Sequence, residues 1–490
     1  MAVSSLLLQG FGLLISIVIN FSGGSGAAGG YRLVIALYAF FVLIPSSGLS
    51  VAAVRMVSGC CAESRSDKAI FISDRLILAG TLTACLLSGL MFFFADKLSL
   101  LIPEIEEAPA SLKILSFSLP FSAVTAVIRG YFIAIRRPLI PCIAQIAEGA
   151  AEVLLCVVFL KGCNIFPVIS ACLSSSLAAV PSSVISLFCY FLTRKPEKSG
   201  REKLRVPLKQ VLSIILPCTA SAALRSGLSA AENLLIPLGL MRYGSDPRGA
   251  MADYGLICAM AMPLVIFPSF AVLPFSSLIV TEISAAKTLG RKNGIRHMTE
   301  RLTSMTLEYA IPITIFLAVF SGEIGLCLFG SREAGKYIAA LAPVCPLMYL
   351  DSAADGILKG LDKQTSYFLF NLADSLLRVA LTVILLPVAG PWGIVAVILF
   401  SELFNTTLSY LKLVSTAEIK TDILRNILVP LISALLSCAA VSRSIQEGGL
   451  ILLCLKGVIT AAGYISILLF MERIMQISRK KHSGDKRHIG

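Results

Sequence analysis

The chain is poor in charged and polar residues. Charged side chains make up 14% of its 490 residues, and it has only three histidines and one tryptophan. Soluble domains carry about 25% charged residues, and a mean hydropathy of +0.85 is far from theirs. It also has no Gly-x-x-x-x-Gly-Lys-Ser/Thr sequence, so a P-loop for ATP is excluded. These absences exclude an ordinary soluble domain and a P-loop ATPase.

Long polar segments are absent too. The longest is 194–209, RKPEKSGREKLRVPLK, which contains seven cations. Nucleic-acid binding would need a basic domain outside the membrane, and a glycan polymerase or ligase would need sizeable outer loops with acid–base residues. The outer loops are short and contain no histidine. We therefore expect no nucleic-acid partner and no enzyme.

The fourteen cysteines do not form a metal-binding or disulfide pattern. Most stand singly inside apolar runs, where cysteine behaves as a small hydrophobe. Cys60 and Cys61 are adjacent in an expected cytoplasmic loop, which is a reducing setting. The histidines, His297, His482 and His488, lie in basic segments far from any cysteine cluster. We expect no metal and no cofactor.

What the chain does contain is a succession of apolar runs. A span needs roughly 20 apolar residues, and without water every backbone group must be bonded internally, which continuous runs achieve as helices. The sequence therefore predicts an all-α membrane protein of about fourteen transmembrane helices. The expected helices are 3–21, 31–57, 71–95, 109–135, 138–160, 165–192, 208–241, 252–280, 302–329, 336–359, 365–388, 391–414, 423–442 and 449–472.

The positions of the cations predict the orientation. With both termini cytoplasmic, most of the 42 Lys and Arg fall in cytoplasmic stretches, as the positive-inside rule requires. The same asymmetry accounts for the net charge of +13. Because Met1 runs almost directly into the first apolar helix, we expect no cleavable signal peptide. We expect a multi-pass protein of the cell (cytoplasmic) membrane.

The two halves of the chain resemble each other. Arg129-Gly130-Tyr131 and the following Gln145-Ile-Ala-Glu148 correspond to Lys359-Gly360-Leu361 and Asn371-Leu-Ala-Asp374, with one four-residue gap. Pro-Ser steps also recur at 45–46 and 268–269. Six helices per repeat make the repeats parallel. The expected organisation is an N-terminal lobe 1–193, a linker 194–209, a C-terminal lobe 210–415, two more helices in 416–473 and a basic tail 474–490.

Charged residues inside the expected spans are the candidate functional groups, because a charge in the bilayer centre costs roughly 2.5–3.5 kcal/mol and normally faces a cavity or a partner. Glu148 and Glu152, one turn apart without a cation in their own helix, are candidates for binding a coupling ion, H⁺ or Na⁺. The candidates for a substrate cavity are Arg225, Glu232, Asp351, Asp355, Asp374 and Arg378.

Structural interpretations stay open for these charges. Asp374 and Arg378, and likewise Asp355 and Lys359, stand at i, i+4 and can neutralise each other. Glu308 and Glu402 suit local polar contacts. The prolines of helices 7 and 8 predict bent or broken spans. These bends either take part in transport or are static kinks without a role in the mechanism. These prolines are Pro217, Pro237, Pro263, Pro268 and Pro274.

The most specific resemblance lies in helices 7 and 8. The stretches LPCTASAALRSGLSAAENLLIPLGLMRYG and YGLICAMAMPLVIFPSFAVLPFSSLIVTEISAA resemble the stage V sporulation protein B family, part of the multidrug/oligosaccharidyl-lipid/polysaccharide flippase superfamily. The loop 26–31, the run IPSSGLSVAAVRMV and Arg129-Gly130-Tyr131 resemble the first half of the same family. The resemblance covers about residues 25–415.

This resemblance implies two six-helix lobes plus two C-terminal helices, and a flippase for lipid-linked oligosaccharides or peptidoglycan precursors, often tied to sporulation. Lipid II flippases of the superfamily hold a diphosphate with cavity arginines. By position Arg225 is the best candidate, although helix 1 here lacks the usual arginine. The implied partners are an amphiphilic lipid-linked glycan, membrane lipids and H⁺ or Na⁺, with the protein as a monomer. The alternatives are a cation-coupled multidrug antiporter, which Glu148 and Glu152 would suit, and an assembly factor that transports nothing.

Overall fold

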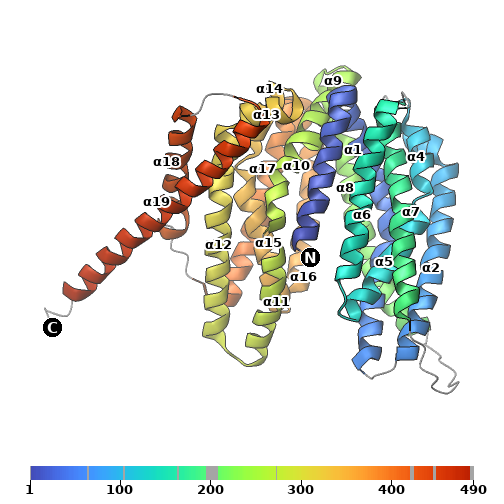
Figure 1. The fold of residues 1–490 in the computed structure, drawn as a ribbon, viewed down its shortest axis with the longest axis horizontal. Helices are drawn as coiled ribbons and strands as arrows, with labels where there is room; N and C mark the ends of the chain where they lie inside the picture. Colours follow the sequence, from blue (N-terminus) through green and yellow to red (C-terminus); the bar gives the residue numbers. More distant parts are fainter. Residues whose placement is uncertain are drawn as a thin grey trace. The chain divides into compact units, whose positions relative to one another are not determined.

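The computed structural model describes residues 2–62, 66–102, 105–162, 165–194, 208–271, 273–419, 424–444 and 448–485. Within these ranges the regular structure is helical, without a strand (Figure 1). This confirms the all-α class expected from the sequence. Most of the expected linker 194–209, namely 195–207, falls outside the described residues.

The number of spans agrees with the sequence. Eleven helices in the described ranges are long and apolar enough to cross a membrane, or up to 13 when each of two bent helix pairs is one span. α1 (Ala2–Ala62) counts once, although its 61 residues would reach about 90 Å, three times the hydrocarbon core. Its helical backbone is interrupted at Gly24, where φ is 76°. We therefore assign two spans to α1, which makes up to fourteen in the described ranges.

The contacts divide the chain into two compact units. Unit 1 comprises Met1–Met260 and Ser375–Ile394, and unit 2 comprises Ala261–Asp374 and Val395–Gly490. This division differs from the one expected from the repeats, in which helices 7 and 8 and all of helix 11 belong to the second lobe. The lobe boundaries derived from the sequence remain a prediction.

Unit 1 holds the first ten elements. After α1 come α2 (Ser66–Phe93), α3 (Ala95–Ser99), α4 (Ala108–Ser116), α5 (Leu119–Ala134), α6 (Leu139–Gly162), α7 (Pro167–Thr193), α8 (Leu208–Tyr243), α9 (Pro247–Tyr254) and nearly all of the π-helix η1 (Gly255–Ala261). The later part of α16 (Gln364–Ala389) and the start of α17 (Pro391–Ala417) also belong to it.

Unit 2 begins at the end of η1. It contains α10 (Met262–Ile266), the 3₁₀ helix η2 (Phe267–Ala271), α11 (Leu273–Thr288), α12 (Lys292–Val319), α13 (Ser321–Phe329), α14 (Arg332–Leu341) and α15 (Val344–Gly360). The first part of α16 and most of α17 follow. The unit ends with the π-helix η3 (Leu424–Leu428), α18 (Val429–Ser444) and α19 (Leu450–Asp485).

Proline explains where the expected helix 8 is interrupted. The stretch 252–280 passes from α9 through η1, α10 and η2 into α11, with Pro263, Pro268 and Pro274 at or beside the changes of helix type. Each proline removes a backbone donor, so the α-helical ladder loses one hydrogen bond at that point. α8 contains Pro217 and Pro237 yet stays one helix of 36 residues. The broken span expected from these prolines is found in helix 8, and a bend within the continuous helix 7 stays a prediction.

The internal repeat is visible in the bent spans. α4 and α5 form one span bent by 45°, and α14 and α15 form another bent by 49°. These are helices 4 and 10 of the sequence, which the repeat makes equivalent. Both spans end in a left-handed residue, Arg136 with φ 59° and Asp362 with φ 56°.

Two glycines and two cores repeat in the same way. A Cβ on Gly130 would lie 2.6 Å from the Ser50 carbonyl oxygen in α1, and one on Gly360 would lie 3.0 Å from the Val280 carbonyl oxygen in α11. One core joins α1, α2, α5 and α7, and another joins α11, α12, α15 and α17. Helices 2, 3, 4 and 6 are therefore packed like helices 8, 9, 10 and 12.

Several expected boundaries are wrong, and helix 9 begins at Lys292 instead of at 302. Helix 9, expected at 302–329, is divided at Phe320 into the long α12 and the short α13. The expected helix 14 ends at 472, whereas α19 continues to Asp485. Hydropathy ends a span where polar residues begin, but a helix can continue beyond that point because its backbone bonds are internal.

Candidate functional site

Three helices of unit 1 bring a carboxyl group and two hydroxyl groups together. Glu152 of α6 accepts a hydrogen bond from Ser175 of α7. The Tyr31 hydroxyl of α1 lies 3.4 Å from the same Glu152 oxygen and 3.2 Å from the Ser175 Oγ. In the part of the chain that the structure describes, no cation lies within ion-pair distance of Glu152. Glu152 is thus stabilised by hydroxyl donors alone.

The second carboxylate of α6 lies near an arginine. Glu148 lies beside Ser182 and in the electrostatic field of Arg129 of α5. With the Gln145 amide oxygen turned toward the guanidinium, Arg129 donates two hydrogen bonds to it, at 2.8 and 3.0 Å. The Arg129 Nε is buried and has no hydrogen-bond partner among the described residues. Glu148 and Glu152 therefore have different surroundings although they stand one turn apart.

A second polar group of unit 1 lies on α8 and α16. Arg378 Nη1 is 4.0 Å from Glu232 Oε1, with both side chains less than one-fifth exposed. Next to Glu232, the Asn233 Oδ1 accepts a 2.6 Å hydrogen bond from the Tyr254 hydroxyl. This group combines fixed charges with a neutral donor–acceptor pair.

Arg225 lies two turns before Glu232 on α8. Its side chain is exposed, and it makes no hydrogen bond or ion pair with any residue that the structure describes. It stands at the middle of α8, which begins at Leu208 and ends at Tyr243. A cation at this depth with no counter-charge would be costly unless water or a ligand meets it.

Unit 2 collects carboxylates from three helices. Asp351 of α15 accepts a 2.8 Å hydrogen bond from Ser409 of α17, and the Tyr367 hydroxyl lies 3.5 Å from its other oxygen. Asp374 of α16 accepts a hydrogen bond from Ser401 of α17. Asp351, Asp374 and Glu402 are all at most 9% exposed. The carboxylates lie close enough to repel one another, so the cluster is an electronegative part of the membrane interior.

One face of α17 serves this cluster. Ser401, Asn405 and Ser409 are spaced one turn apart, so their side chains share a face. Asn405 is 4% exposed, and its Oδ1 has no hydrogen-bond partner among the described residues. No three carboxyl, thiol or imidazole groups converge to hold one metal ion in the described ranges. Asp351 and Asp374 are held by separate hydroxyl donors.

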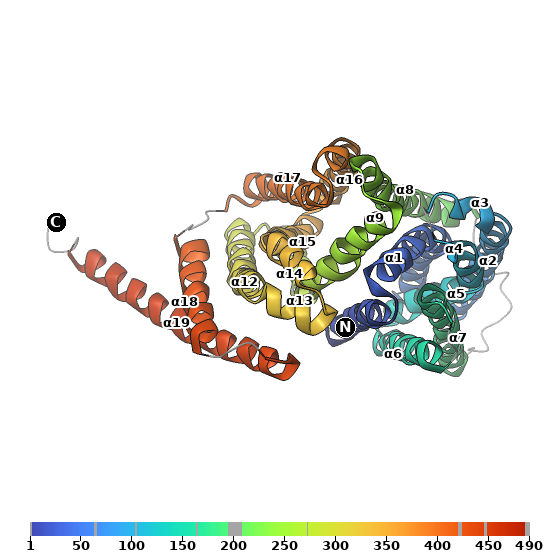
Figure 2. The same cartoon turned by 90° about the horizontal axis from the view of Figure 1, so that it is seen from above.

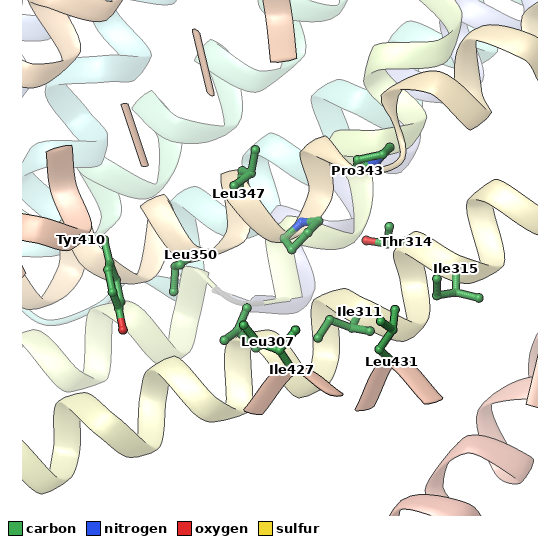
Figure 3. A pocket seen from close by; sticks show the side chains of 11 residues that line it. Leu307, Ile311, Thr314, Ile315, Pro343, Leu347, Leu350, Tyr410, Ile427 and Leu431 are labelled. Atoms are coloured by element: carbon green, nitrogen blue, oxygen red, sulfur yellow. The ribbon is translucent and has the colours of Figure 1, made fainter. Parts of the chain in front are cut away.

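Unit 2 also contains an apolar pocket of about 540 Å³ (Figure 3). Pro343, where α14 bends into α15, lines one part of it, and α12, α15, α17, η3 and α18 supply the other lining residues. The lining residues are Leu307, Ile311, Thr314, Ile315, Pro343, Pro346, Leu347, Leu350, Tyr410, Ile427 and Leu431. Nearly every lining side chain is hydrocarbon, so the pocket suits an apolar chain.

The first 279 residues, more than half of the chain, match the family described as polysaccharide biosynthesis protein. The chain belongs to this family. Stage V sporulation protein B of Bacillus subtilis (strain 168) is 22% identical to it over 381 residues, which cover 75% of this chain and 73% of that protein. This match confirms the resemblance to the stage V sporulation protein B family that the sequence of this family member shows.

Two solved structures show the fold. The lipid II flippase MurJ, in an inward closed conformation, has a TM-score of 0.75 at 12% identity and covers 96% of this chain and 98% of its own. An inward-facing multidrug resistance MATE family transporter of the MOP superfamily has a TM-score of 0.69 at 13% identity and covers 85% and 96%. This family member therefore has the MATE/MOP fold of a multi-pass membrane protein. Both structures are of proteins that move molecules and not of enzymes, as expected for this chain.

The structure brings some predicted residues together. Glu148 and Glu152 lie in one polar region of unit 1, and Asp351 and Asp374 both reach α17. Asp355 accepts a 2.6 Å bond from Lys359, which confirms that local pair. Glu308 accepts a bond from Ser304 one turn away, as a local contact would. The pairing of Asp374 with Arg378 stays a prediction.

Sequence reasoning missed other members of these groups. Arg129 was not among the candidates, yet it donates to Gln145 and is near Glu148. Tyr31 and Ser175 carry no charge, so the search for charges within spans passes over them. Arg32 of α1 lies near Tyr254 and Cys258 and was not among the candidates either.

Proposed function

We propose that this family member is a flippase that moves a lipid-linked oligosaccharide or peptidoglycan precursor across the bacterial cytoplasmic membrane. The observation that carries the proposal is Arg225, an exposed cation at the middle of a membrane-spanning helix without a described counter-charge. The phosphates of a lipid-linked sugar would supply that counter-charge. Family membership and the MurJ-like fold support the same substrate class.

The head group would be held mainly by unit 1. Arg225 would bind phosphate, and Arg378, 4.0 Å from Glu232, would exchange that carboxylate for a phosphate oxygen when cargo enters. Arg32 adds a third cation near the Tyr254–Asn233 pair. The Asn233 amide and the Tyr254 hydroxyl would form hydrogen bonds with the hydroxyl groups of a sugar. The remaining cavity candidates, Asp351, Asp355 and Asp374, lie in unit 2 and repel phosphate, so we assign them no contact with the diphosphate.

Glu148 and Glu152 would reset the transporter by taking up a cation, for which we favour H⁺. Glu152 has two hydroxyl donors and no described cation, so its ionised form lacks full compensation. Protonation removes that charge, while Ser175 and Tyr31 stay within hydrogen-bond reach of the carboxyl. Na⁺ would instead need further oxygen ligands beside those of Glu152, Ser175 and Tyr31.

The apolar pocket of unit 2 would take part of the lipid tail. The pocket is lined by hydrocarbon and lies among membrane-spanning helices. A membrane lipid chain would fill it in the absence of substrate, and the tail of the substrate would replace that chain. We place both termini in the cytoplasm on the basis of the cation asymmetry, and we expect a monomer. Alternating access would reorient the two lobes about the linker 194–209.

The test is a transbilayer exchange assay. Purified protein is placed in vesicles that carry labelled lipid II, or one of several undecaprenyl-diphosphate sugars, in one leaflet. We expect the protein to speed the appearance of at least one of them in the opposite leaflet, compared with protein-free vesicles. No movement of any member of the panel would contradict the proposal.

A cation-coupled multidrug antiporter is the second candidate, and the carboxylate cluster of unit 2 favours it. Three buried carboxyl groups, Asp351, Asp374 and Glu402, with an unpartnered Asn405 amide oxygen would suit an organic cation better than a diphosphate. Efflux of organic cations from the same vesicles, stimulated by a proton or sodium gradient, would support it. Under the flippase proposal we expect no such efflux.

A further inference from the structure

A buried ion pair joins α19 to α13 within unit 2. Lys456 Nζ of α19 lies 2.7 Å from each carboxylate oxygen of Glu323 in α13. The side chains of Lys456 and Glu323 are 1% and 16% exposed, and the ammonium group is 5.3 Å from the centre of the Phe320 ring. Loss of one partner would leave the other charge uncompensated in an apolar setting. The pair therefore fixes this part of α19 to α13.

α13 is itself firmly seated. A Cβ on Gly325 would lie 2.6 Å from the Gly335 backbone nitrogen, and one on Gly335 would lie 2.8 Å from the Ser321 carbonyl oxygen. These contacts place the backbones of α13 and α14 directly against each other. α14 continues through the bend at Pro343 into α15. Glu323 thus stands on the same hairpin that leads into one wall of the pocket.

α19 in turn holds α18. Ser437 of α18 donates a 2.7 Å hydrogen bond to the Thr460 carbonyl of α19, and a Cβ on Gly463 would lie only 2.5 Å from the Ser437 Oγ. Two turns after Lys456, the Tyr464 hydroxyl donates a 2.7 Å bond to the Glu308 carbonyl of α12. Figure 2 shows α18 and α19 crossing, with α19 continuing beyond the crossing. α19 is thus fixed at Lys456 and at Tyr464, and α18 packs against the part of α19 between these two residues.

Ile427 of η3 and Leu431 of α18 line the pocket beside α12 (Figure 3). We propose that Lys456 and Glu323 are positioning residues for the lipid tail: their ion pair holds α19, α19 holds α18, and α18 shapes the pocket. This inference rests on the proposed flippase function. It predicts that the pair affects recognition of the tail and leaves recognition of the head group unchanged.

The test compares two substrates with the same sugar-diphosphate head, one with a full-length polyprenyl tail and one with a short prenyl tail. We expect Lys456→Met to raise the apparent KM for the long-tailed substrate about tenfold and leave that for the short-tailed one unchanged. Exchanging the charges, with Lys456→Glu and Glu323→Lys together, should restore most of the preference. Arg473→Met, which removes an exposed cation of the same helix, is the matched control and should change neither value.

A milder variant covers the case in which Lys456→Met does not fold. Tyr464→Phe removes only the hydroxyl that bonds to α12, and it should raise the KM for the long tail alone by a smaller factor. Equal changes for both tails, in either variant, would show a purely structural role and overturn the inference. Wild-type protein that moves neither substrate would overturn the proposed function itself, so the two failures are distinguishable.

Discussion

Gly130 of α5 lies so close to Ser50 of α1 that a Cβ on the glycine would be 2.6 Å from the serine carbonyl oxygen. A Cβ carbon forms no hydrogen bond and does not approach a backbone oxygen this closely unless one of the two backbones shifts. The Ala53 Cβ, at 2.9 Å, closes the same space from the next turn. The crossing of these two spans therefore depends on the missing side chain.

Gly130→Ala should destabilise the protein by about 1–3 kcal/mol, the usual cost of overpacking a core. Thermal unfolding in detergent measures it. Gly89→Ala in α2 is the matched control, because nothing lies within 4 Å of its Cβ position and alanine favours a helix. A midpoint for Gly130→Ala equal to that of Gly89→Ala would contradict the close crossing.

Glu152→Gln should lower transport driven by a pH gradient at least about tenfold, equivalent to about 1.4 kcal/mol. The amide keeps an acceptor for Ser175 and Tyr31 but cannot take up and release a proton. Uptake is measured in vesicles with and without the gradient. Glu106→Gln, at an exposed position between α3 and α4, is the control and should behave as wild type. Full gradient-driven transport by Glu152→Gln would remove this carboxylate from the coupling mechanism.

Asp362, in the loop between α15 and α16, predicts a pH dependence of stability. Lys287 donates a 2.6 Å hydrogen bond to its carboxylate and lowers the pKa of Asp362 below the ordinary value of aspartate. Because the folded-state pKa is below that of the unfolded chain, the contribution to stability is complete above about pH 3.9 and is lost as the pH falls through the folded value.

The check uses Asp362→Asn, since asparagine tolerates the φ of 56° found there. The unfolding midpoint of wild type should exceed that of Asp362→Asn at pH 7, and the two should converge as the pH falls below about 3.9. An equal difference between the two unfolding midpoints at pH 7 and below about pH 3.9 would contradict the assignment of the effect to the Lys287 bond.

Much of the fold could be predicted from the sequence, because lipid leaves the backbone few solutions. The apolar runs located the spans, and Gly130 and Gly360 marked equivalent helices in the two halves before any packing was known. Boundaries failed where helices continue without apolar residues, as in α19. The division of helix 9 at Phe320 had no proline to announce it.

The site was predicted less well, because it depends on which helices are neighbours. A pair within one helix, such as Asp355 and Lys359, follows from spacing alone. Lys456 and Glu323 are 133 residues apart, and no local pattern shows that they meet. Ser175 and Tyr31 are uncharged, so nothing in a single sequence distinguishes them from other hydroxyl residues of the spans.

The central claim is that Arg225 holds the phosphates of a lipid-linked cargo, and its most direct test is the rate of lipid II exchange in vesicles containing Arg225 variants. We expect Arg225→Ala to lower the rate at least about tenfold, or about 1.4 kcal/mol, and Arg225→Lys to retain part of it. Arg242→Ala, at the end of the same helix, should exchange lipid II like wild type. Wild-type exchange by Arg225→Ala at normal membrane levels would contradict the claim and favour an assembly factor that transports nothing.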